Sequence, residues 1–217
     1  KNNKDIIIYN FPPTRKLRDN RVEKQRYIQT DDIKIGYLGQ IIKKKGVDLF
    51  VDAALKIIEK YNTCTFYIAG SLDSDAKFSD ELFQKLENCR YRDKIIFLGE
   101  IDDVELFFKN IDVLCVPSVK QEPLGNVLVE AKKYKTPCVI FNSGGMPELI
   151  NHKSNGFICE DYSAKCIELG LKYYIDNPEL IKIHGVNAFN SIEDLEIGYI
   201  YYRKKWLDVF EINNQDD

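Results

Sequence analysis

The feature that most constrains this sequence is a regular alternation between short apolar runs and amphipathic stretches. Apolar runs with strand character occur at residues 33–39, 64–70, 94–99, 112–118 and 137–143. Stretches with helical periodicity separate most of them and occupy residues 47–60, 76–90, 104–109 and 126–134. This alternation is typical of right-handed βαβ units, which build a parallel sheet. We therefore expect an α/β fold in which helices cover both faces of a parallel sheet.

The 217 residues divide by composition into three parts. Residues 1–30 are mostly polar apart from three isoleucines and a Phe-Pro-Pro segment, and we expect a short initial strand and a linker there. Residues 31–190 hold the alternation and are expected to form one Rossmann-like domain. Residues 191–217 are expected to form a final helix, from about Ser191 to Phe210, and a tail.

Composition excludes several classes of protein. Apolar residues make up 44% and charged residues 30%, which is ordinary for a globular domain and excludes global disorder. A net charge of −3 argues against a dedicated nucleic-acid binder, which normally carries a basic excess. No apolar run approaches the roughly 20 residues that span a bilayer, and no signal peptide is visible, so we expect a cytoplasmic protein. Because the first residue is Lys, we expect a processed chain or part of a longer one.

The cysteines and histidines do not form a metal-binding pattern. The six cysteines contain no Cys-x-x-Cys pair, and we expect buried free thiols in a reducing compartment. Neither His152 nor His184 lies at metal-ligand spacing from a cysteine, and we expect each to be a surface or helix residue. The sequence therefore predicts neither a metal site nor a cofactor.

Small residues end every expected strand. The runs close on Gly39, Gly70, Gly99, Ser118 and the segment Ser143-Gly144-Gly145. Glycine allows a tight turn and a close approach of a ligand to the backbone. In open parallel sheets ligands bind beyond the carboxyl ends of the strands. We therefore expect one shared site at that edge, with ordinary turn chemistry as the alternative.

The turn after the first strand has the character of a phosphate site. Residues 39–46 read GQIIKKKG and place Lys43, Lys44 and Lys45 immediately before a helix. A helix N-terminus and a mobile ammonium group both favour phosphate. The dinucleotide and P-loop fingerprints are both missing, which disfavours dehydrogenases and P-loop NTPases. A solvated lysine run in a lysine-rich protein is the alternative.

Residues 117–131, PSVKQEPLGNVLVEA, are the most informative segment. A strand ends at Ser118, a loop carries Glu122, and a helix that begins after Gly125 carries Glu130 about one turn in. We expect Glu122 to face a sugar ring and Glu130, which shares a helix face with Asn126, to accept ribose hydroxyls. The backbone N–H groups of Leu124 and Gly125 would point at a pyrophosphate. Glu160 and Glu168 have the same spacing without the strand–loop–Gly–helix setting, and we expect Glu160 to be a surface carboxylate.

This segment resembles the E-x7-E signature of the family-4 retaining glycosyltransferases, which have the GT-B fold. Other segments resemble the same family in the same order: YLGQIIKKKGVDLFVDA, FYIAGS, DKIIFLGEI and TPCVIFNSGGMPELI. The resemblance covers about residues 33–159 and implies the C-terminal, donor-binding domain. It implies a hexosyltransferase of bacterial glycan biosynthesis that retains the anomeric configuration and needs no metal.

The resemblance also implies roles for individual residues. Glu122 would contact the transferred sugar, and Lys45 the donor diphosphate. The turn residues Gly39 and Gln40 and the helix-start residues Leu124, Gly125 and Asn126 would line the donor site. Ile101 would lie in the nucleobase pocket, and Glu130 would bind ribose. The family usually has Arg where this chain has Gln40, and glutamine cannot supply the charged, bidentate grip of arginine on phosphate.

The resemblance implies that half of the enzyme is missing. The family has two Rossmann-like domains, and the acceptor usually binds the N-terminal one, which must come from the protein's own missing domain or from a partner chain. The donor would be a nucleoside-diphosphate sugar, with UDP favoured over GDP, and the acceptor a lipid-linked or plain saccharide. The complete protein would be cytoplasmic or peripheral at the inner membrane face. Two alternatives stay open: a non-catalytic nucleotide-sugar-binding module that acts with a partner, and a sugar-nucleotide epimerase of GT-B type.

Overall fold

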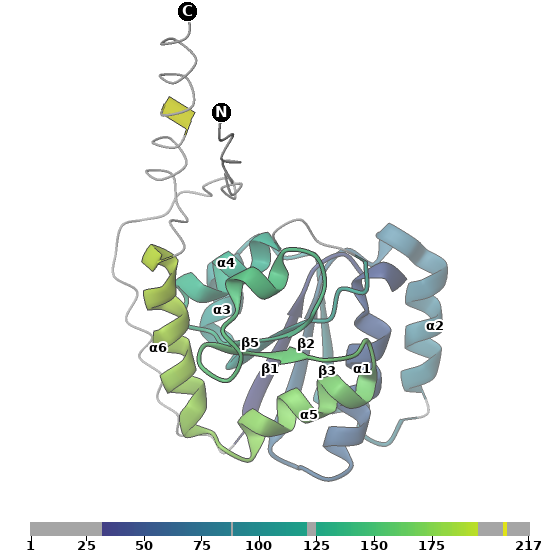
Figure 1. The fold of residues 1–217 in the computed structure, drawn as a ribbon. Helices are drawn as coiled ribbons and strands as arrows, with labels where there is room; N and C mark the ends of the chain where they lie inside the picture. Colours follow the sequence, from purple (N-terminus) through teal and green to yellow (C-terminus); the bar gives the residue numbers. More distant parts are fainter. Residues whose placement is uncertain (1–31, 88, 121–124, 195–205, 208–217) are drawn as a thin grey trace, which may run out of the picture.

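The computed structural model describes residues 32–87, 89–120, 125–194 and 206–207. Its centre is a sheet of six parallel strands in the order β3-β2-β1-β4-β5-β6 (Figure 1). The strands are β1 (Ile33–Leu38), β2 (Cys64–Ala69), β3 (Ile95–Gly99), β4 (Val113–Val116), β5 (Cys138–Phe141) and β6 (Gly156–Cys159). The expected α/β fold with a parallel sheet is thus confirmed.

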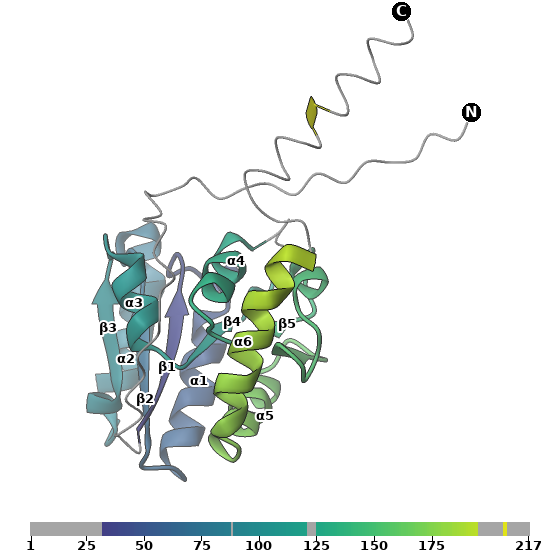
Figure 2. The same cartoon turned by 90° about the vertical axis from the view of Figure 1, so that its left-hand side faces the viewer.

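Within the described residues there are six α-helices and four short 3₁₀ helices, of which α5 and α6 follow the last strand. The helices are α1 (Val47–Ile58), α2 (Ala76–Glu87), α3 (Val104–Asn110), α4 (Asn126–Lys133), α5 (Ala164–Ile175) and α6 (Glu179–Asp194). The 3₁₀ helices are η1 (Lys43–Lys45), η2 (Asp73–Asp75), η3 (Arg92–Lys94) and η4 (Met146–Leu149). Among these described elements, α3, α4 and α6 lie on one side of the sheet and α1, α2 and α5 on the other (Figure 2).

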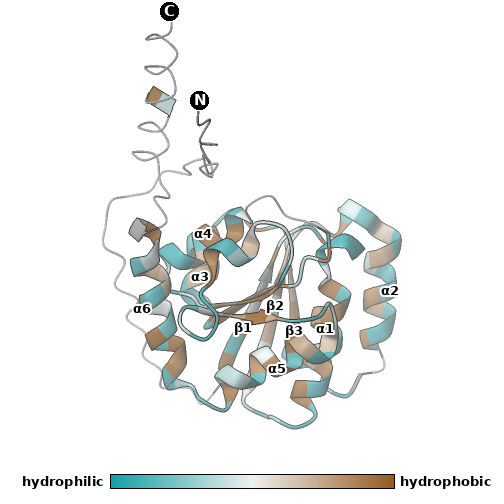
Figure 3. Cartoon of the chain, in the orientation of Figure 1, coloured by the Kyte–Doolittle hydropathy of each residue, from teal (hydrophilic) through white to brown (hydrophobic). Residues whose placement is uncertain are grey.

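Strand periodicity explains why there are two cores. In β4, Val113 and Cys115 belong to the cluster that α1, α2 and α5 cover. Leu114 and Val116 belong to the cluster that α3, α4 and η4 cover. Successive side chains of a strand point to opposite faces, so an unbroken apolar run is stable only when both faces are covered. Figure 3 shows the strands as largely hydrophobic and the helices as divided between hydrophobic and hydrophilic positions.

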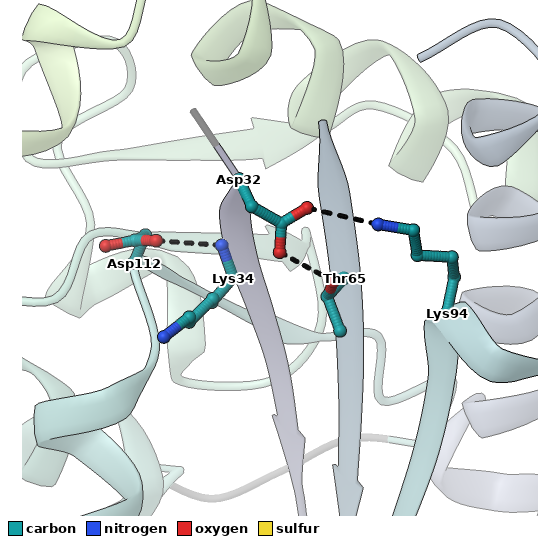
Figure 4. A network of polar contacts seen from close by, with 5 residues as sticks. All are labelled: Asp32, Lys34, Thr65, Lys94 and Asp112. Carbon is teal, nitrogen blue, oxygen red and sulfur yellow. Dashed lines mark hydrogen bonds and ion pairs between the residues drawn. The ribbon is translucent and has the colours of Figure 1, made fainter. Parts of the chain in front are cut away.

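The amino ends of the strands are tied by a polar network (Figure 4). The main-chain N–H of Lys34 donates to Asp112 Oδ2 at 2.7 Å, and Thr65 Oγ1 donates to Asp32 Oδ2 at 2.6 Å. Lys94 Nζ lies 3.5 Å from Asp32 Oδ1. These contacts join β1 to its neighbours at the end of the sheet opposite to the glycine-rich turns. We assign this network to stability.

The end of the described chain differs from expectation. Helix α5 begins after Ser163, whose side chain accepts from the N–H of Cys166. Helix α6 begins at Glu179 and continues past Ser191 to Asp194, so the final helix expected from Ser191 has no separate start there. The division of the chain into 1–30, 31–190 and 191–217 stays a prediction, because most of both outer segments lies outside the described residues.

Candidate functional site

The carboxyl ends of the strands meet at one edge, as the glycine-rich endings predict. The N–H of Gly39 donates to the carbonyl of Ala69 at 3.0 Å, and the N–H of Gly70 donates to that of Gly99 at 2.8 Å. The turns after β1, β2 and β3 are therefore in contact. The strand order reverses direction between β1 and β4, which are neighbours. Ligands of open α/β sheets bind in the crevice at such a switch point.

At this switch point the lysine turn after β1 is fastened to the chain that follows β4. The N–H groups of Val119 and Lys120 both donate to the carbonyl of Lys44, at 3.1 and 3.3 Å. Gly46 has φ +69°, and a Cβ there would lie 1.9 Å from the carbonyl oxygen of Pro117. Only glycine fits this position, because a side chain would be strained by the backbone and would collide with the neighbouring loop. The segment GQIIKKKG therefore ends in glycine for a tertiary reason.

The side chains of this turn differ in exposure. Lys43, Lys44 and Gln40 are exposed, while Lys45 is half-buried. The carbonyl of Gln40 accepts from the Tyr37 hydroxyl at 2.7 Å, which holds the backbone of the turn while the amide side chain faces solvent. The structure thus places Gly39, Gln40 and Lys45 at the shared edge. Their roles toward a donor stay predictions.

Helix α4 begins at the same edge. Its N-cap, Gly125, has φ +73° and no side chain that could cap the helix. An added Cβ at Gly125 would lie 3.2 Å from Met146 Cγ, so the start of α4 packs closely on η4, which follows β5. Asn126 is exposed, and Glu130 lies half-buried one turn further along. The first turn of α4 directs backbone N–H groups and the positive end of the helix dipole toward the edge.

Two predicted site residues, Glu122 and Leu124, lie outside the described residues, in the gap between Lys120 and Gly125. A third, Ile101, follows β3 at the margin of the sheet and is half-buried against the core under α3 and α4. Since β2 separates β3 from β1, strand spacing places Ile101 about 10 Å along the edge from the lysine turn. The structure therefore brings Ile101 to the same edge but not next to the lysine turn.

Sequence reasoning missed two groups beside the site. Asp48 Oδ1, in the first turn of α1, and Ser143 Oγ, just after β5, are buried without a hydrogen-bond partner among the described residues. The signal for Asp48 was its position two residues after Gly46, at the start of a helix. Ser143 stood in the Ser-Gly-Gly strand ending, but nothing in that pattern indicated burial of its hydroxyl.

A third missed group is Lys132 of α4. Its side chain is fully buried and Nζ donates to Ser191 Oγ of α6 at 2.5 Å. Burial lowers the pKa of the Lys132 ammonium to about 8. In the sequence this lysine lies on a helix with both polar and apolar residues, so its burial could not be predicted. It is buried because α6 packs on α4.

The cysteines and histidines of the described residues are explained by packing and hydrogen bonding. All six cysteines are free and five of them are buried. His152 is exposed and accepts from the N–H of Ile158, while His184 is buried in α6 beside the Tyr174 hydroxyl. Burial lowers the pKa of His184. Within the described ranges, no group of three or more His, Cys, Asp or Glu side chains could hold a metal ion, and no helix is long and apolar enough to span a membrane.

Fold and site together define a class: an α/β domain with lysines and a helix N-terminus at the switch point of its sheet. Ligands of such sheets bind at the switch point, and a helix N-terminus favours anions. The family model described as glycosyl transferases group 1 matches residues 19–190, and the chain belongs to this family. The resemblance to GT-B glycosyltransferases is thereby confirmed.

Two curated relatives are informative. The chain is 26% identical over 159 residues to the lipopolysaccharide core biosynthesis mannosyltransferase LpcC of Rhizobium leguminosarum bv. viciae, covering 73% of this chain and 45% of that one. It is 31% identical over 164 residues to the N-acetyl-alpha-D-glucosaminyl L-malate synthase of Bacillus anthracis, covering 74% and 42%. The chain therefore spans less than half the length of these relatives.

Solved structures match the fold. Anabaena HepE, in complex with UDP and glucose, aligns with a TM-score of 0.75 at 21% identity over 83% of this chain and 48% of its own. The C-terminal domain of the glycosyl transferase group 1 protein LpcC of Francisella tularensis aligns with a TM-score of 0.68 at 27% identity over 81% and 92%. The described domain thus matches a C-terminal GT-B domain, as the sequence predicts.

Proposed function

We propose that this chain is the donor half of a retaining hexosyltransferase that binds a nucleoside-diphosphate sugar, with UDP as the favoured nucleotide. The observation that carries the proposal is the attachment of the lysine turn after β1 to the chain after β4, through the Lys44 carbonyl. This attachment places the turn that carries Lys45 beside the segment after β4, the segment that leads on to α4. A diphosphate is the ligand whose charge and size suit that arrangement. The UDP complex of HepE supports the choice of nucleotide.

The chemical work of this half would be electrostatic. When the sugar leaves, negative charge grows on the diphosphate, and Lys45 with the first N–H groups of α4 would stabilise it. The exposed ammonium groups of Lys43 and Lys44 offset part of the charge that Gln40 does not supply. The base would extend along the edge toward Ile101, about two strand spacings away. The half-buried carboxylate of Glu130 would accept hydrogen bonds from the ribose hydroxyls.

Glu122 would orient the transferred sugar. A group that positions the reacting centre affects the transition state more than ground-state binding. In an active protein that contains this domain, Glu122→Gln should lower kcat while donor affinity changes little. Equal losses in both would contradict the positioning role. An acceptor, saccharide or lipid-linked, would bind mainly to a further domain or a partner chain.

Titration calorimetry of the chain against UDP, GDP and their sugars tests the donor site. We expect UDP to bind, and we expect Lys45→Ala and Glu130→Ala each to weaken binding roughly 10- to 100-fold, since each removes a contact to or from a charged group. Lys56→Ala, an exposed lysine near the far end of α1, serves as the matched control and should bind normally. Equal affinities for Lys45→Ala and Lys56→Ala, or no nucleotide binding at all, would overturn the proposal.

A further inference from the structure

An exposed tyrosine is held rigidly at the carboxyl edge of the sheet. Tyr162 follows β6, and the residue is 49% exposed. Its hydroxyl donates to the carbonyl of Asn142 at 2.8 Å. Its ring packs edge-on against Phe141, with ring centroids 5.2 Å apart and an angle of 87° between planes. An exposed aromatic side chain normally samples several orientations, whereas this one is fixed at both its ring and its hydroxyl.

Polar residues follow β5 and β6 next to Tyr162. Phe141 of β5 pairs with Cys159 of β6, so Asn142 and Glu160 leave the sheet side by side. Asn142, Glu160 and Asp161 are all exposed. In the part of the chain that the structure describes, their side chains have no hydrogen bond or ion pair. Glu160, the carboxylate that the sequence assigned to an ordinary surface, therefore belongs to a distinct group of side chains at this edge.

A pyranose ring has the complementary chemistry. Its C–H groups form an apolar face that stacks on an aromatic ring, and its equatorial hydroxyls donate to carboxylates and amide oxygens. A rigid ring loses little conformational entropy when it binds such a ligand. Strand spacing places Tyr162 about 10 Å along the edge from the end of β4, where α4 and the proposed sugar-orienting loop begin. That separation leaves the donor crevice clear for the nucleotide sugar.

We propose that Tyr162, Asn142 and Glu160 form a saccharide-binding subsite that takes a sugar ring of the acceptor beside the donor crevice. The assignment to the acceptor rests on the proposed donor function. The stacking site itself rests on the geometry of Tyr162 and its neighbours. Asp161 adds a second carboxylate at the rim.

Saturation-transfer-difference NMR of the 217-residue chain, with a panel of methyl glycosides and disaccharides and with excess UDP present, tests the subsite. We expect ring-proton signals from at least one saccharide. Tyr162→Ala should weaken that binding by roughly 2- to 10-fold, and Tyr162→Phe should retain more of it because the ring remains. Glu160→Gln should weaken binding without changing the ring. Phe189→Ala, an aromatic residue of α6 with a similar exposure of 44%, is the matched control and should have no effect.

The outcomes separate the two proposals. Saccharide signals that are equal in Tyr162→Ala and the unaltered chain, with the fold verified by circular dichroism, would overturn the subsite. A chain that binds UDP but no saccharide would overturn it as well and leave the donor site standing. Signals that depend on Tyr162 in a chain that does not bind UDP would support the stacking site and overturn the donor function.

Discussion

At the scale of single residues, the lysine turn and the β5 loop illustrate two kinds of constraint. Gly46 is required by backbone conformation and by the approach of Pro117. Ser143 carries a buried hydroxyl that has no partner in the described structure. The first constraint stabilises the turn after β1, and the second lowers stability at the loop after β5. Substitution by alanine tests each constraint: it adds a methyl group at Gly46 and removes the hydroxyl oxygen at Ser143.

Gly46→Ala should lower the free energy of unfolding. The left-handed conformation alone costs alanine roughly 1–2 kcal/mol, and the collision with the Pro117 carbonyl adds to this cost. Urea unfolding measures the change. Gly39→Ala is the control, because a Cβ there would make only an ordinary contact, 3.4 Å from the Tyr37 hydroxyl. Equal stability of the two variants would contradict the role assigned to Gly46.

Ser143→Ala should raise the free energy of unfolding by about 1 kcal/mol, because it removes a buried hydroxyl that lacks a hydrogen bond. Ser79→Ala gives the contrast. Ser79 is also buried, but its hydroxyl donates to the carbonyl of Leu72 at 2.8 Å, so its removal should be destabilising by a similar amount. If thermal unfolding shows the two variants shifted in the same direction, the description of Ser143 is wrong.

At the scale of elements, the packing of α4 on α6 buries a charged group. Lys132 lies two residues after Glu130, and its Nζ bonds Ser191 of α6. Asn155 Nδ2 also reaches Ser191 Oγ, at 3.4 Å. The helix that carries a predicted donor-binding carboxylate is therefore anchored through a buried amine.

Stability should depend on the protonation of Lys132. Burial lowers its pKa to about 8, below the usual 10.5, so the unfolded chain holds this proton to higher pH than the folded chain. This contribution makes the protein more stable as pH rises from about 8 to 10.5. Lys132→Met should remove it and raise the free energy of unfolding near pH 7 by about 2–3 kcal/mol.

The measurement is the difference in urea midpoint between the two proteins from pH 7 to 10. The difference is needed because burial raises the pKa of Cys64, which destabilises the folded state as pH rises and affects both proteins equally. If the difference in urea midpoint between the two proteins does not become smaller as pH rises, the role given to the Lys132 charge is wrong.

At the scale of the whole molecule, the two ends of the sheet carry different kinds of residues. The amino ends carry the network of Asp32, Lys34 and Asp112, and the carboxyl ends carry the turns of the candidate site. Substitutions at the amino ends should therefore change stability without changing ligand binding at the carboxyl ends.

UDP should stabilise the folded chain by mass action. At a free concentration 100 times its Kd, the gain is about 2.7 kcal/mol, which appears as a rise in Tm. Uridine, which lacks the diphosphate, should produce a much smaller rise at the same concentration. Asp112→Ala should lower Tm by removing the acceptor of the Lys34 N–H and leave the UDP-induced rise intact. A loss of that rise in Asp112→Ala would show that the two ends are coupled.

The sequence alone determined which segments form the sheet and which turns follow the carboxyl ends of its strands. The apolar runs located the five strands from β1 to β5. The ends of β4 and β5 were placed one to two residues too wide, at 112–118 and 137–143, because Pro117 and Pro137 lack the N–H that a sheet ladder needs. The start expected at Ser191 was wrong for another reason, since α6 passes that point without a helix-breaking residue. The rest of that expected helix lies mostly outside the described residues.

Only the tertiary structure decided which contacts form between segments that are far apart in the sequence. The bonds from residues 119 and 120 to Lys44, the burial of Lys132 under α6 and the clamping of Tyr162 by Asn142 join residues 20 to 76 positions apart. Local patterns report the face and conformation of one segment, whereas these contacts depend on strand order and on the fit of one loop against another. The sequence therefore indicated a donor-binding edge, and the fold showed which groups share it.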